Sequence, residues 1–363
     1  MRIGIDASRA LRTIKTGTEY YSEQIIFHLA QIDRHNEYIL YAKSNPLPPL
    51  NQLPSNFHWK IMPFPRGWTL IRLSYEMAKN PPDVLFIPAH TLPLITPQKS
   101  LVMVHDIGFI HLPQLYPWRQ KIYHRFVINF VKKYATHLLT PSLYVKQDLI
   151  QTLKINPQRI TAIHHGYNQQ LYRKTSSCPS YISRFIPYIF YLGRLEKKKN
   201  LSNLIKAYYL LRKQLPYKIH LVLGGKRSHG FSELEEIINT NNQYQKEIVF
   251  PGYLEEKEVP LWLSCASLFV FPSQNEGFGF PVIEAQATEC PVVCSDCTAL
   301  PEIGGKGALY FNPQDPQDIA QKMLKVLTEP QLKKELIKNG KENLKRFSWT
   351  EAAKKTLKVL ESI

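Results

Sequence analysis

The segment with the clearest chemical potential combines an apolar run, a glycine-containing loop and a helix start. It covers residues 271–284 and reads FPSQNEGFGFPVIE. Its two glycines let the backbone come close to a ligand, and Pro281 suits the first turn of a helix. Helix N-termini bind anions through their N–H groups and the helix dipole. We therefore expect an anion to bind at this helix start, against Phe278, Gly279 and Phe280.

Two glutamates, Glu276 and Glu284, flank this expected anion site. A carboxylate beside a bound phosphate is unfavourable unless it accepts hydrogen bonds, and sugar hydroxyls are good donors. The pair therefore predicts a sugar phosphate as ligand, with Glu276 on a hexose and Glu284 on a ribose. The alternative is an ordinary solvated pair of acids near a helix start, where acids are favoured in any case.

A second cluster of charged residues follows another apolar run. It covers residues 191–200 and reads YLGRLEKKKN. Arg194 offers a planar fork of donors to phosphate oxygens, and Lys199 adds a point charge. The alternative is a basic surface run, which is how we interpret Lys197 and Lys198.

These residues lie at the ends of apolar runs that alternate with amphipathic runs, as strands and helices do in βα units. In the first half we expect strands at 2–6, 37–42, 57–62, 83–87, 101–104, 137–140 and 160–163, and helices at 18–33, 117–134 and 142–153. In the second half we expect strands at 187–192, 219–224, 247–251, 267–272, 291–294 and 308–311. The simplest architecture is two α/β arrays with mostly parallel sheets, whose ligands bind beyond the carboxyl ends of the strands.

The length supports two domains rather than one. The chain has 363 residues, of which 44% are hydrophobic, so two sizeable cores can form. The alternating rhythm breaks at residues 170–187, where lysine, serine and proline indicate a linker. Near the other end, Ser348 and Glu351 form a capping box that predicts a final helix.

Together these segments resemble glycosyltransferase family 4, whose members have the GT-B fold. The motifs that carry the resemblance are Glu276 and Glu284 with seven residues between them, Gly193-Arg194 with Lys199-Asn200, Pro301-Glu302, Thr16-Gly17-Thr18 and His105-Asp106. The resemblance covers essentially the whole chain. The run VHDIGF at residues 104–109 is most similar to bacterial mannosyltransferases that build O-antigen-type polysaccharides, a mannosyltransferase B-like subgroup.

The resemblance implies two Rossmann-like domains that face each other across a central cleft. Residues 1–170 would bind the acceptor, residues 171–346 would bind the nucleotide sugar, and residues 347–363 would return to the first domain as a helix. The implied reaction is retaining transfer of a hexose to a glycan or lipid-linked acceptor in cell-surface polysaccharide or lipopolysaccharide synthesis, without a metal or other cofactor. Mannose from GDP-mannose is the expected donor, and a UDP-sugar for glucosyl or N-acetylglucosaminyl transfer is the alternative.

In the second half, the resemblance also assigns roles to single residues. Arg194, Lys199 and the helix start would neutralise the leaving diphosphate, which is electrostatic stabilisation of a developing charge. Tyr253 and Leu254 would contact the base. Glu276 would act either as a nucleophile or as a residue that positions the sugar for displacement on one face.

In the first half, the resemblance implies that Gly17 lets its loop close over the phosphates and that His105 lies near the transferred sugar. A lone histidine is more often packed or solvated, but a strand end beside an acid favours a functional role. The sequence departs from the family at two places. Glu19 stands where many members have a second glycine, and Gly305-Lys306 replaces a commoner Gly-Asp.

The formal net charge of +17 calls for an anionic partner or for a solvated basic face. Residues 1–170 hold 19 Lys and Arg against 9 Asp and Glu, a net +10, and the remaining residues carry +7. Nucleic acid, an anionic membrane and phosphorylated substrates are the three candidate partners. The basic runs are scattered and include no helix-turn-helix, zinc or RNA-binding motif, so we expect no nucleic acid and keep a basic nucleic-acid-binding protein only as an alternative function. A non-catalytic homologue is disfavoured because both glutamates and both cations are intact.

Residues 117–134 predict a basic amphipathic helix. Ile122, Phe126, Phe130 and Tyr134 share one face, and lysines and arginines surround it. One interpretation is an ordinary helix with that face in the core and a charged back. The other is a helix that lies on an anionic membrane surface, which would suit a lipid-linked acceptor.

The chain shows no apolar run of about 18 residues and no signal peptide at its start, so we expect a cytoplasmic protein that associates at most peripherally with the inner face of the membrane. The five cysteines are an odd number without the spacing of a disulfide framework. Cys290, Cys294 and Cys297 lack an adjoining histidine, which disfavours a zinc site.

Overall fold

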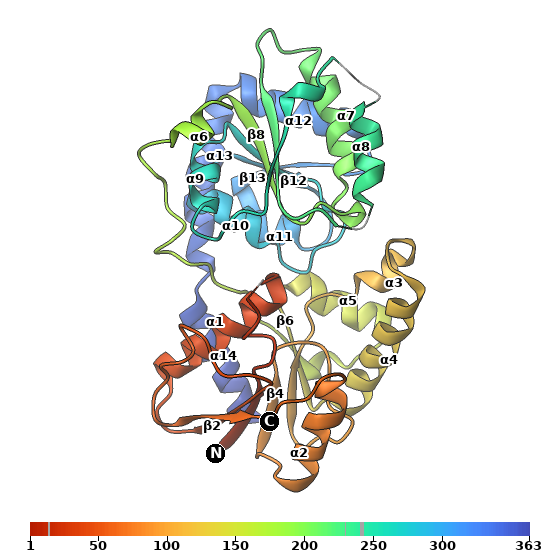
Figure 1. Ribbon diagram of the computed structural model, residues 1–363, viewed down its shortest axis with the longest axis vertical. Helices are drawn as coiled ribbons and strands as arrows, with labels where there is room; N and C mark the ends of the chain where they lie inside the picture. Colours follow the sequence, from red (N-terminus) through yellow and green to blue (C-terminus); the bar gives the residue numbers. More distant parts are fainter. Residues whose placement is uncertain (14, 229, 240–242) are drawn as a thin grey trace. The chain divides into compact units, whose positions relative to one another are not determined.

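The computed structural model describes residues 1–13, 15–228, 230–239 and 243–363. Over these ranges the chain forms two compact units (Figure 1). The first unit consists of Met1–Gly166 and Phe347–Ile363, and the second consists of Tyr167–Arg346. Each unit is built on one parallel sheet, so the predicted α/β class with two parallel arrays is confirmed. The division falls after Gly166, whereas the sequence placed it after residue 170.

The first unit has a seven-stranded parallel sheet with the order β3-β2-β1-β4-β5-β6-β7. Its strands are β1 (Arg2–Asp6), β2 (Glu37–Ala42), β3 (Phe57–Ile61), β4 (Val84–Ile87), β5 (Ser100–Met103), β6 (His137–Thr140) and β7 (Ile160–Ala162). All of them coincide within about a residue with apolar runs in the sequence. The strand order reverses between β1 and β4, which is where open α/β sheets bind ligands.

The helices of the first unit are α1 (Gly17–Ile32), α2 (Ser74–Lys79), α3 (Gly108–His111), α4 (Trp118–Tyr134), α5 (Leu143–Leu153) and α14 (Trp349–Ser362). A π-helical turn, Trp68–Leu73, precedes α2 and was not predicted. Helix α14 packs against α1 (Figure 1), with Trp349 in ring contact with Tyr20 and Tyr21. As the capping box predicts, the Glu351 N–H donates to the Ser348 hydroxyl at 3.3 Å. A Cβ on Gly166 would lie 2.1 Å from the backbone nitrogen of Trp349, so the contact requires glycine.

Helix α4 has apolar residues on its exposed face as well as on its buried face. Val127, Ile128 and Val131 are buried against the sheet. Of the face that the sequence singled out, Ile122 (60% exposed), Phe126 (49%) and Tyr134 (48%) are exposed, whereas Phe130 packs partly against the core. Trp118, one turn before Ile122, is 64% exposed, and together these five residues form the α4 ridge. The interpretation of this face as a core-facing stripe is therefore wrong for Ile122, Phe126 and Tyr134, because Val127, Ile128 and Val131 are the residues of α4 that are buried.

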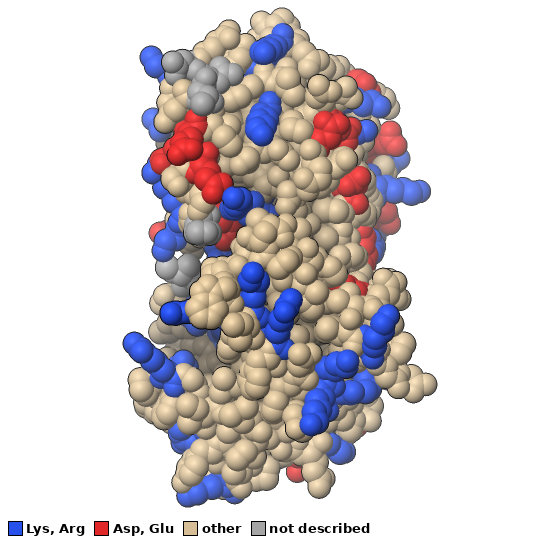
Figure 2. Space-filling view, turned by 90° about the vertical axis from the view of Figure 1, so that its right-hand side faces the viewer, with Lys and Arg blue, Asp and Glu red and all other residues tan. Residues whose placement is uncertain are grey.

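Basic side chains surround the α4 ridge. Arg119 lies over the Trp118 ring at 5.3 Å, and Lys133 lies over the Tyr134 ring at 5.0 Å. Figure 2 looks onto the side of the first unit that carries α4, where Lys and Arg side chains gather and Asp and Glu are sparse. Among the described residues, no helix has the length and hydropathy needed to cross a bilayer.

The second unit has a six-stranded parallel sheet with the order β10-β9-β8-β11-β12-β13. Its strands are β8 (Tyr188–Leu192), β9 (His220–Gly224), β10 (Ile248–Gly252), β11 (Leu268–Phe271), β12 (Val292–Ser295) and β13 (Ala308–Phe311). Its helices are α6 (Ser180–Ser183), α7 (Leu201–Arg212), α8 (Phe231–Asn239), α9 (Val259–Cys265), α10 (Phe280–Ala287), α11 (Leu300–Gly304), α12 (Pro316–Thr328) and α13 (Pro330–Asn343).

The segment 170–187 is not a free linker, contrary to the sequence interpretation. Tyr172 and Ile182 are buried in the core of the second unit. The Lys174 ammonium donates to the carbonyl of Ser264 at 2.6 Å. The core residues anchor the segment in the second unit, and the Lys174 bond ties it to α9, although serine and proline give it a linker-like composition.

A disulfide joins Cys178 to Cys265, with 5.8 Å between their Cα atoms. The cysteine count alone had not predicted this bond, because the two residues lie 87 positions apart and only the folding of the 170–187 segment onto α9 brings them together. Cys290, Cys294 and Cys297 are not disulfide-bonded. Burial raises the pKa of the Cys290 thiol to about 12 and that of Cys297 to about 11, so both are protonated at neutral pH.

Candidate active site

The two charged clusters of the second unit lie at one edge of its sheet. Strands β8 and β11 are hydrogen-bonded neighbours and run parallel. The loops after them therefore start side by side at the carboxyl edge. Lys199 belongs to the loop after β8, and Glu276 belongs to the loop after β11.

Lys199 and Glu276 form an ion pair between these loops. Both side chains are mostly enclosed, with 14% of Lys199 and 17% of Glu276 exposed. The Lys199 ammonium also lies 5.7 Å from the centre of the Phe271 ring. The loop is held from behind by Asn200, whose amide donates to the carbonyl of Pro313 at 2.6 Å. Lys199 and Glu276, which belong to separate motifs in the sequence, are thus in direct contact in the fold.

The backbone of Glu276 is fixed by a third loop. Its N–H donates to the hydroxyl of Thr298, which follows β12, at 3.2 Å. Its carbonyl accepts from the N–H of Ala299 at 3.4 Å. Sequence reasoning missed Thr298, although its position after a strand, as for Lys199 and Glu276, was an available signal.

Helix α10 begins directly after this loop, with Gly279 at its N-cap in a left-handed conformation (φ 109°). A Cβ at this position would lie 2.7 Å from Leu300, so both the conformation and the space favour glycine. The rings of Phe278 and Phe280 contact each other edge to face at 5.0 Å. A glycine cap brings no side chain of its own to the helix N-terminus, where backbone N–H groups and the dipole attract anions.

Glu284 lies in α10 and is only 8% exposed. Burial, and then the nearby charge of Glu256, raise the pKa of its carboxyl to about 8, while a hydrogen bond with Tyr172 opposes the shift. At neutral pH the unliganded protein therefore holds Glu284 mainly as a neutral acid, which can donate and accept hydrogen bonds. Its surroundings differ from those of Glu276, so the two glutamates are not a solvated pair.

Three other predicted residues follow strands β8 and β10 of the same sheet. Arg194, after β8, has a half-exposed guanidinium that lies 3.4 Å from the Glu196 carboxylate. Tyr253 follows the edge strand β10 and is 57% exposed. Leu254 instead belongs to the hydrophobic core of the unit. A base could therefore contact the Tyr253 ring directly, whereas Leu254 supports the loop from below.

In the first unit, His105 follows β5 and is half-buried. Its Nε2 lies 3.0 Å from the Pro88 carbonyl, to which it donates, and its ring meets that of Tyr21 edge to face at 5.2 Å. Burial lowers its pKa, against the opposing effects of the Pro88 hydrogen bond and Asp106. The imidazole is therefore neutral at pH 7 and fixed in orientation.

Gly17 begins α1, and the departure at Glu19 has a local explanation. Glu19 is the acid of a capping box, and its Oε2 accepts from the Thr16 N–H at 3.1 Å. Its Oε1 accepts from Arg9 at 3.1 Å and from Arg12 at 3.4 Å. Burial would raise the pKa of Glu19, but the Thr16 hydrogen bond and Arg9 hold it below its usual value. Glu19 thus organises the start of α1.

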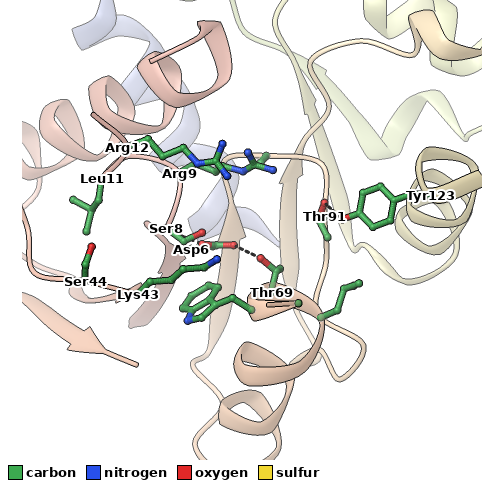
Figure 3. A pocket seen from close by; sticks show the side chains of 14 residues that line it. Asp6, Ser8, Arg9, Leu11, Arg12, Lys43, Ser44, Thr69, Thr91 and Tyr123 are labelled. Atoms are coloured by element: carbon green, nitrogen blue, oxygen red, sulfur yellow. Dashed lines mark hydrogen bonds between the residues drawn. The ribbon is translucent and has the colours of Figure 1, made fainter. Parts of the chain in front are cut away.

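The first unit also contains a pocket of about 460 Å³ that sequence reasoning missed (Figure 3). It lies beyond β1, β2 and β4, and Asp6, Arg9, Arg12, Lys43, Thr69 and Tyr123 are among its lining residues. Asp6 ends β1 and is buried there. No single motif contains these residues, because they come from loops far apart in the sequence.

Family comparisons match both units. Residues 16–171 match the family described as "Glycosyltransferase Family 4", and residues 186–343 match the family described as "Glycosyl transferases group 1". The chain belongs to glycosyltransferase family 4. The predicted family is thereby confirmed.

Individual proteins agree with this assignment. The O-antigen chain mannosyltransferase B of Escherichia coli is 26% identical over 72% of this glycosyltransferase and 69% of its own length. Sucrose-phosphate synthase of Thermosynechococcus elongatus superposes with a TM-score of 0.78 at 18% identity, over 99% of this chain and 98% of that chain. Anabaena HepE, in complex with UDP-glucose, gives a TM-score of 0.74 at 17% identity, over 100% and 99%. These structures share the GT-B fold predicted from the sequence.

The residues predicted for the glycosyltransferase site fall into two groups. Lys199, Glu276 and the start of α10 are held together at one sheet edge of the second unit, with Arg194 on the same loop as Lys199 and Tyr253 on the loop after the edge strand β10. Gly17 and His105 belong to the first unit. Their roles in the reaction stay predictions. Within the described ranges, no group of three or more His, Cys, Asp and Glu side chains is arranged to hold a metal ion.

Proposed function

We propose that this glycosyltransferase transfers a hexose, with retention of configuration, from a nucleotide diphosphate sugar to a glycan or lipid-linked acceptor in cell-surface polysaccharide synthesis. The ion pair of Lys199 and Glu276 beside the glycine-capped start of α10 carries this proposal. A cation and a helix N-terminus, which suit a diphosphate, thereby lie next to a carboxylate, which can accept hydrogen bonds from a sugar.

The cationic part of the site would bind the diphosphate. As the bond to the sugar breaks, negative charge accumulates on the leaving phosphate, and preorganised donors stabilise it. Lys199 is already fixed at the site, whereas the half-exposed Arg194 can exchange Glu196 for phosphate oxygens. In this scheme the protein itself neutralises the leaving group, and we propose that no metal is needed.

The two carboxyl groups would bind the two sugars of the donor. Glu276 can accept hydrogen bonds from hexose hydroxyls while Lys199 moves its charge toward the phosphates. Glu284, neutral at pH 7 because of its raised pKa, can exchange hydrogen bonds with ribose hydroxyls, which also donate and accept. Glu276 would act as a nucleophile or as a positioning residue for same-face displacement.

Mannose from GDP-mannose is the donor that we propose first. The similarity to the Escherichia coli mannosyltransferase supports it. A UDP-sugar is the second candidate, since the Anabaena protein of the same fold was crystallised with UDP-glucose.

We also propose that the enzyme works on an anionic membrane surface, at the cytoplasmic face, through α4. The exposed ridge of Trp118, Ile122 and Phe126 could enter the interface between headgroups and acyl chains. The surrounding lysines and arginines would attract anionic headgroups (Figure 2). A lipid-linked acceptor would be presented at such a surface.

The test is a panel of GDP- and UDP-sugars, with release of free nucleotide and sugar measured for the purified protein. We expect turnover of GDP-mannose, and a large loss in Lys199→Ala. Lys198→Ala is the matched control, because Lys198 is the preceding residue but pairs with Glu196. Turnover of UDP-sugars alone would overturn the mannosyl assignment. Equal turnover by Lys199→Ala and wild type would overturn the site.

A further inference from the structure

The pocket of the first unit lies where the topology of its sheet favours ligand binding. Its walls come mainly from the segments that follow β1, β2, β3 and β4, and the strand order reverses between β1 and β4. Its volume of about 460 Å³ falls within the range of small-molecule sites. None of the catalytic or donor-binding residues predicted from the sequence lines this pocket.

Cations dominate the lining side chains of the pocket. Figure 3 shows the guanidinium groups of Arg9 and Arg12 next to each other, with the Lys43 side chain extending toward Asp6. Of the guanidinium nitrogens of Arg9 and Arg12, only the two Nη1 atoms donate to Glu19, which lies outside the pocket wall. Within the described part of the chain, their Nε and Nη2 groups thus have no acceptor and can serve a ligand.

The acidic group of the pocket is already satisfied by the protein. Asp6 Oδ1 accepts from the Ser8 N–H at 3.0 Å, and Oδ2 accepts from the Thr69 hydroxyl at 3.2 Å. Lys43 is exposed and makes no ion pair with any described residue. Counting Glu19, three cations face two carboxylates, so a net positive charge is left for a ligand.

The opposite wall of the pocket connects it to α4. Tyr123 belongs to this helix, and its hydroxyl lies 3.4 Å from that of Thr91. The residues on either side in the ridge, Ile122 and Phe126, are exposed. The pocket thus opens beside the surface that we propose to contact lipid.

We propose that this pocket binds a phosphate group carried by the acceptor. The inference rests on the proposed function and deepens it, because it names the chemistry of the acceptor. Two adjacent guanidinium forks match the oxygens of a phosphate, and Lys43 adds a point charge. The phosphate can belong to a soluble sugar phosphate or to a lipid headgroup held at α4.

Binding of mannose 1-phosphate to the full-length protein tests the pocket, with methyl mannoside as the phosphate-free match. We expect calorimetry to detect the phosphate compound only. Lys43→Ala and Arg12→Ala should each weaken binding about tenfold or more, since each removes a charge-assisted contact. Lys99→Ala is the control, because Lys99 is an exposed lysine that precedes β5 at the opposite end of the sheet.

The source of the phosphate is tested with vesicles that contain phosphatidic acid. If wild type binds the vesicles better than Lys43→Ala does and does not bind mannose 1-phosphate, the proposal that the pocket binds phosphate is supported and its ligand is a lipid phosphate. Two results would overturn the pocket: unchanged affinity of Lys43→Ala and Arg12→Ala for both probes, or loss of mannose 1-phosphate binding in Lys199→Ala alone, which would place the phosphate in the second unit.

The proposed function and the phosphate pocket can be contradicted by different results. Release of nucleotide from nucleotide sugars needs no acceptor phosphate, so its absence in wild type would contradict the transferase reaction and leave the binding result intact. Lys43→Ala should keep wild-type nucleotide binding. A selective loss of donor binding in this variant would show that the pocket serves the donor, which also contradicts the inference.

Discussion

Replacing Glu284 with glutamine should stabilise the protein at alkaline pH and leave its stability at acidic pH nearly unchanged. The folded carboxyl has a pKa of about 8, against an ordinary value of 4.5. Between these two pH values the folded protein retains a proton on Glu284 that the unfolded chain has lost. The free energy of unfolding of wild type therefore falls as the pH rises through this window.

The size of the effect follows from the same two values. Each pH unit within the window corresponds to about 1.4 kcal/mol. Across the whole window, ionisation of Glu284 destabilises the fold by about 5 kcal/mol. Glutamine has nearly the same shape and cannot ionise, so the advantage of Glu284→Gln should grow steadily from pH 5 to pH 8 and then level off. Tyr172 can still hydrogen-bond to the amide.

The measurement is urea-induced unfolding, followed by circular dichroism, of wild type and Glu284→Gln at several pH values between 5 and 9. Taking the difference between the two proteins at each pH removes the contributions of all other groups. Glu335→Gln is the control, because Glu335 is exposed on α13 and should give a flat difference. A flat difference for Glu284→Gln as well would refute the conclusion that this carboxyl is held neutral by burial.

Other predictions concern the ion pair, the helix contact and the membrane surface. Glu276→Ala should abolish transfer while its circular dichroism spectrum remains native, and an active variant would show that Glu276 does not belong to the site. Wild-type activity should be unchanged in EDTA, and inhibition by EDTA would contradict metal-independent transfer. Gly166→Ala should lower the melting temperature by several degrees, because its Cβ would lie 2.1 Å from the backbone of α14, and an unchanged melting curve would be inconsistent with that contact. Wild type should co-sediment with anionic vesicles at low salt, and the double variant Trp118→Ser/Phe126→Ser should bind much less; equal binding would exclude the α4 ridge.

The sequence predicted the strands and helices better than the contacts between side chains from different elements. Strands such as residues 2–6 were recognisable because buried parallel strands are short apolar runs between polar segments. Lys199 and Glu276 were recognised as strand-end residues with charges. Their pairing depends on β8 and β11 being neighbours, which follows from the strand order and not from either motif.

The sequence could not show which apolar and charged side chains from distant parts of the chain come into contact in the fold. The periodicity of α4 identified the ridge of Ile122 and Phe126, but the same periodicity fits a face in the core or in solvent. The buried Tyr172 was hidden in a segment of linker-like composition. The pocket was missed because Arg9 and Lys43 belong to loops that only the folded sheet brings together.

The return of α14 to the first unit has a consequence for biosynthesis. The first unit is discontinuous in the sequence, since residues 347–363 complete it after the whole second unit has been made. Domains generally fold in order of synthesis, from the N-terminus onward. Here the second unit can finish folding on the ribosome first, while the α1 surface around Tyr20 and Tyr21 still lacks Trp349. During that interval the nascent chain exposes an apolar surface that chaperones can recognise.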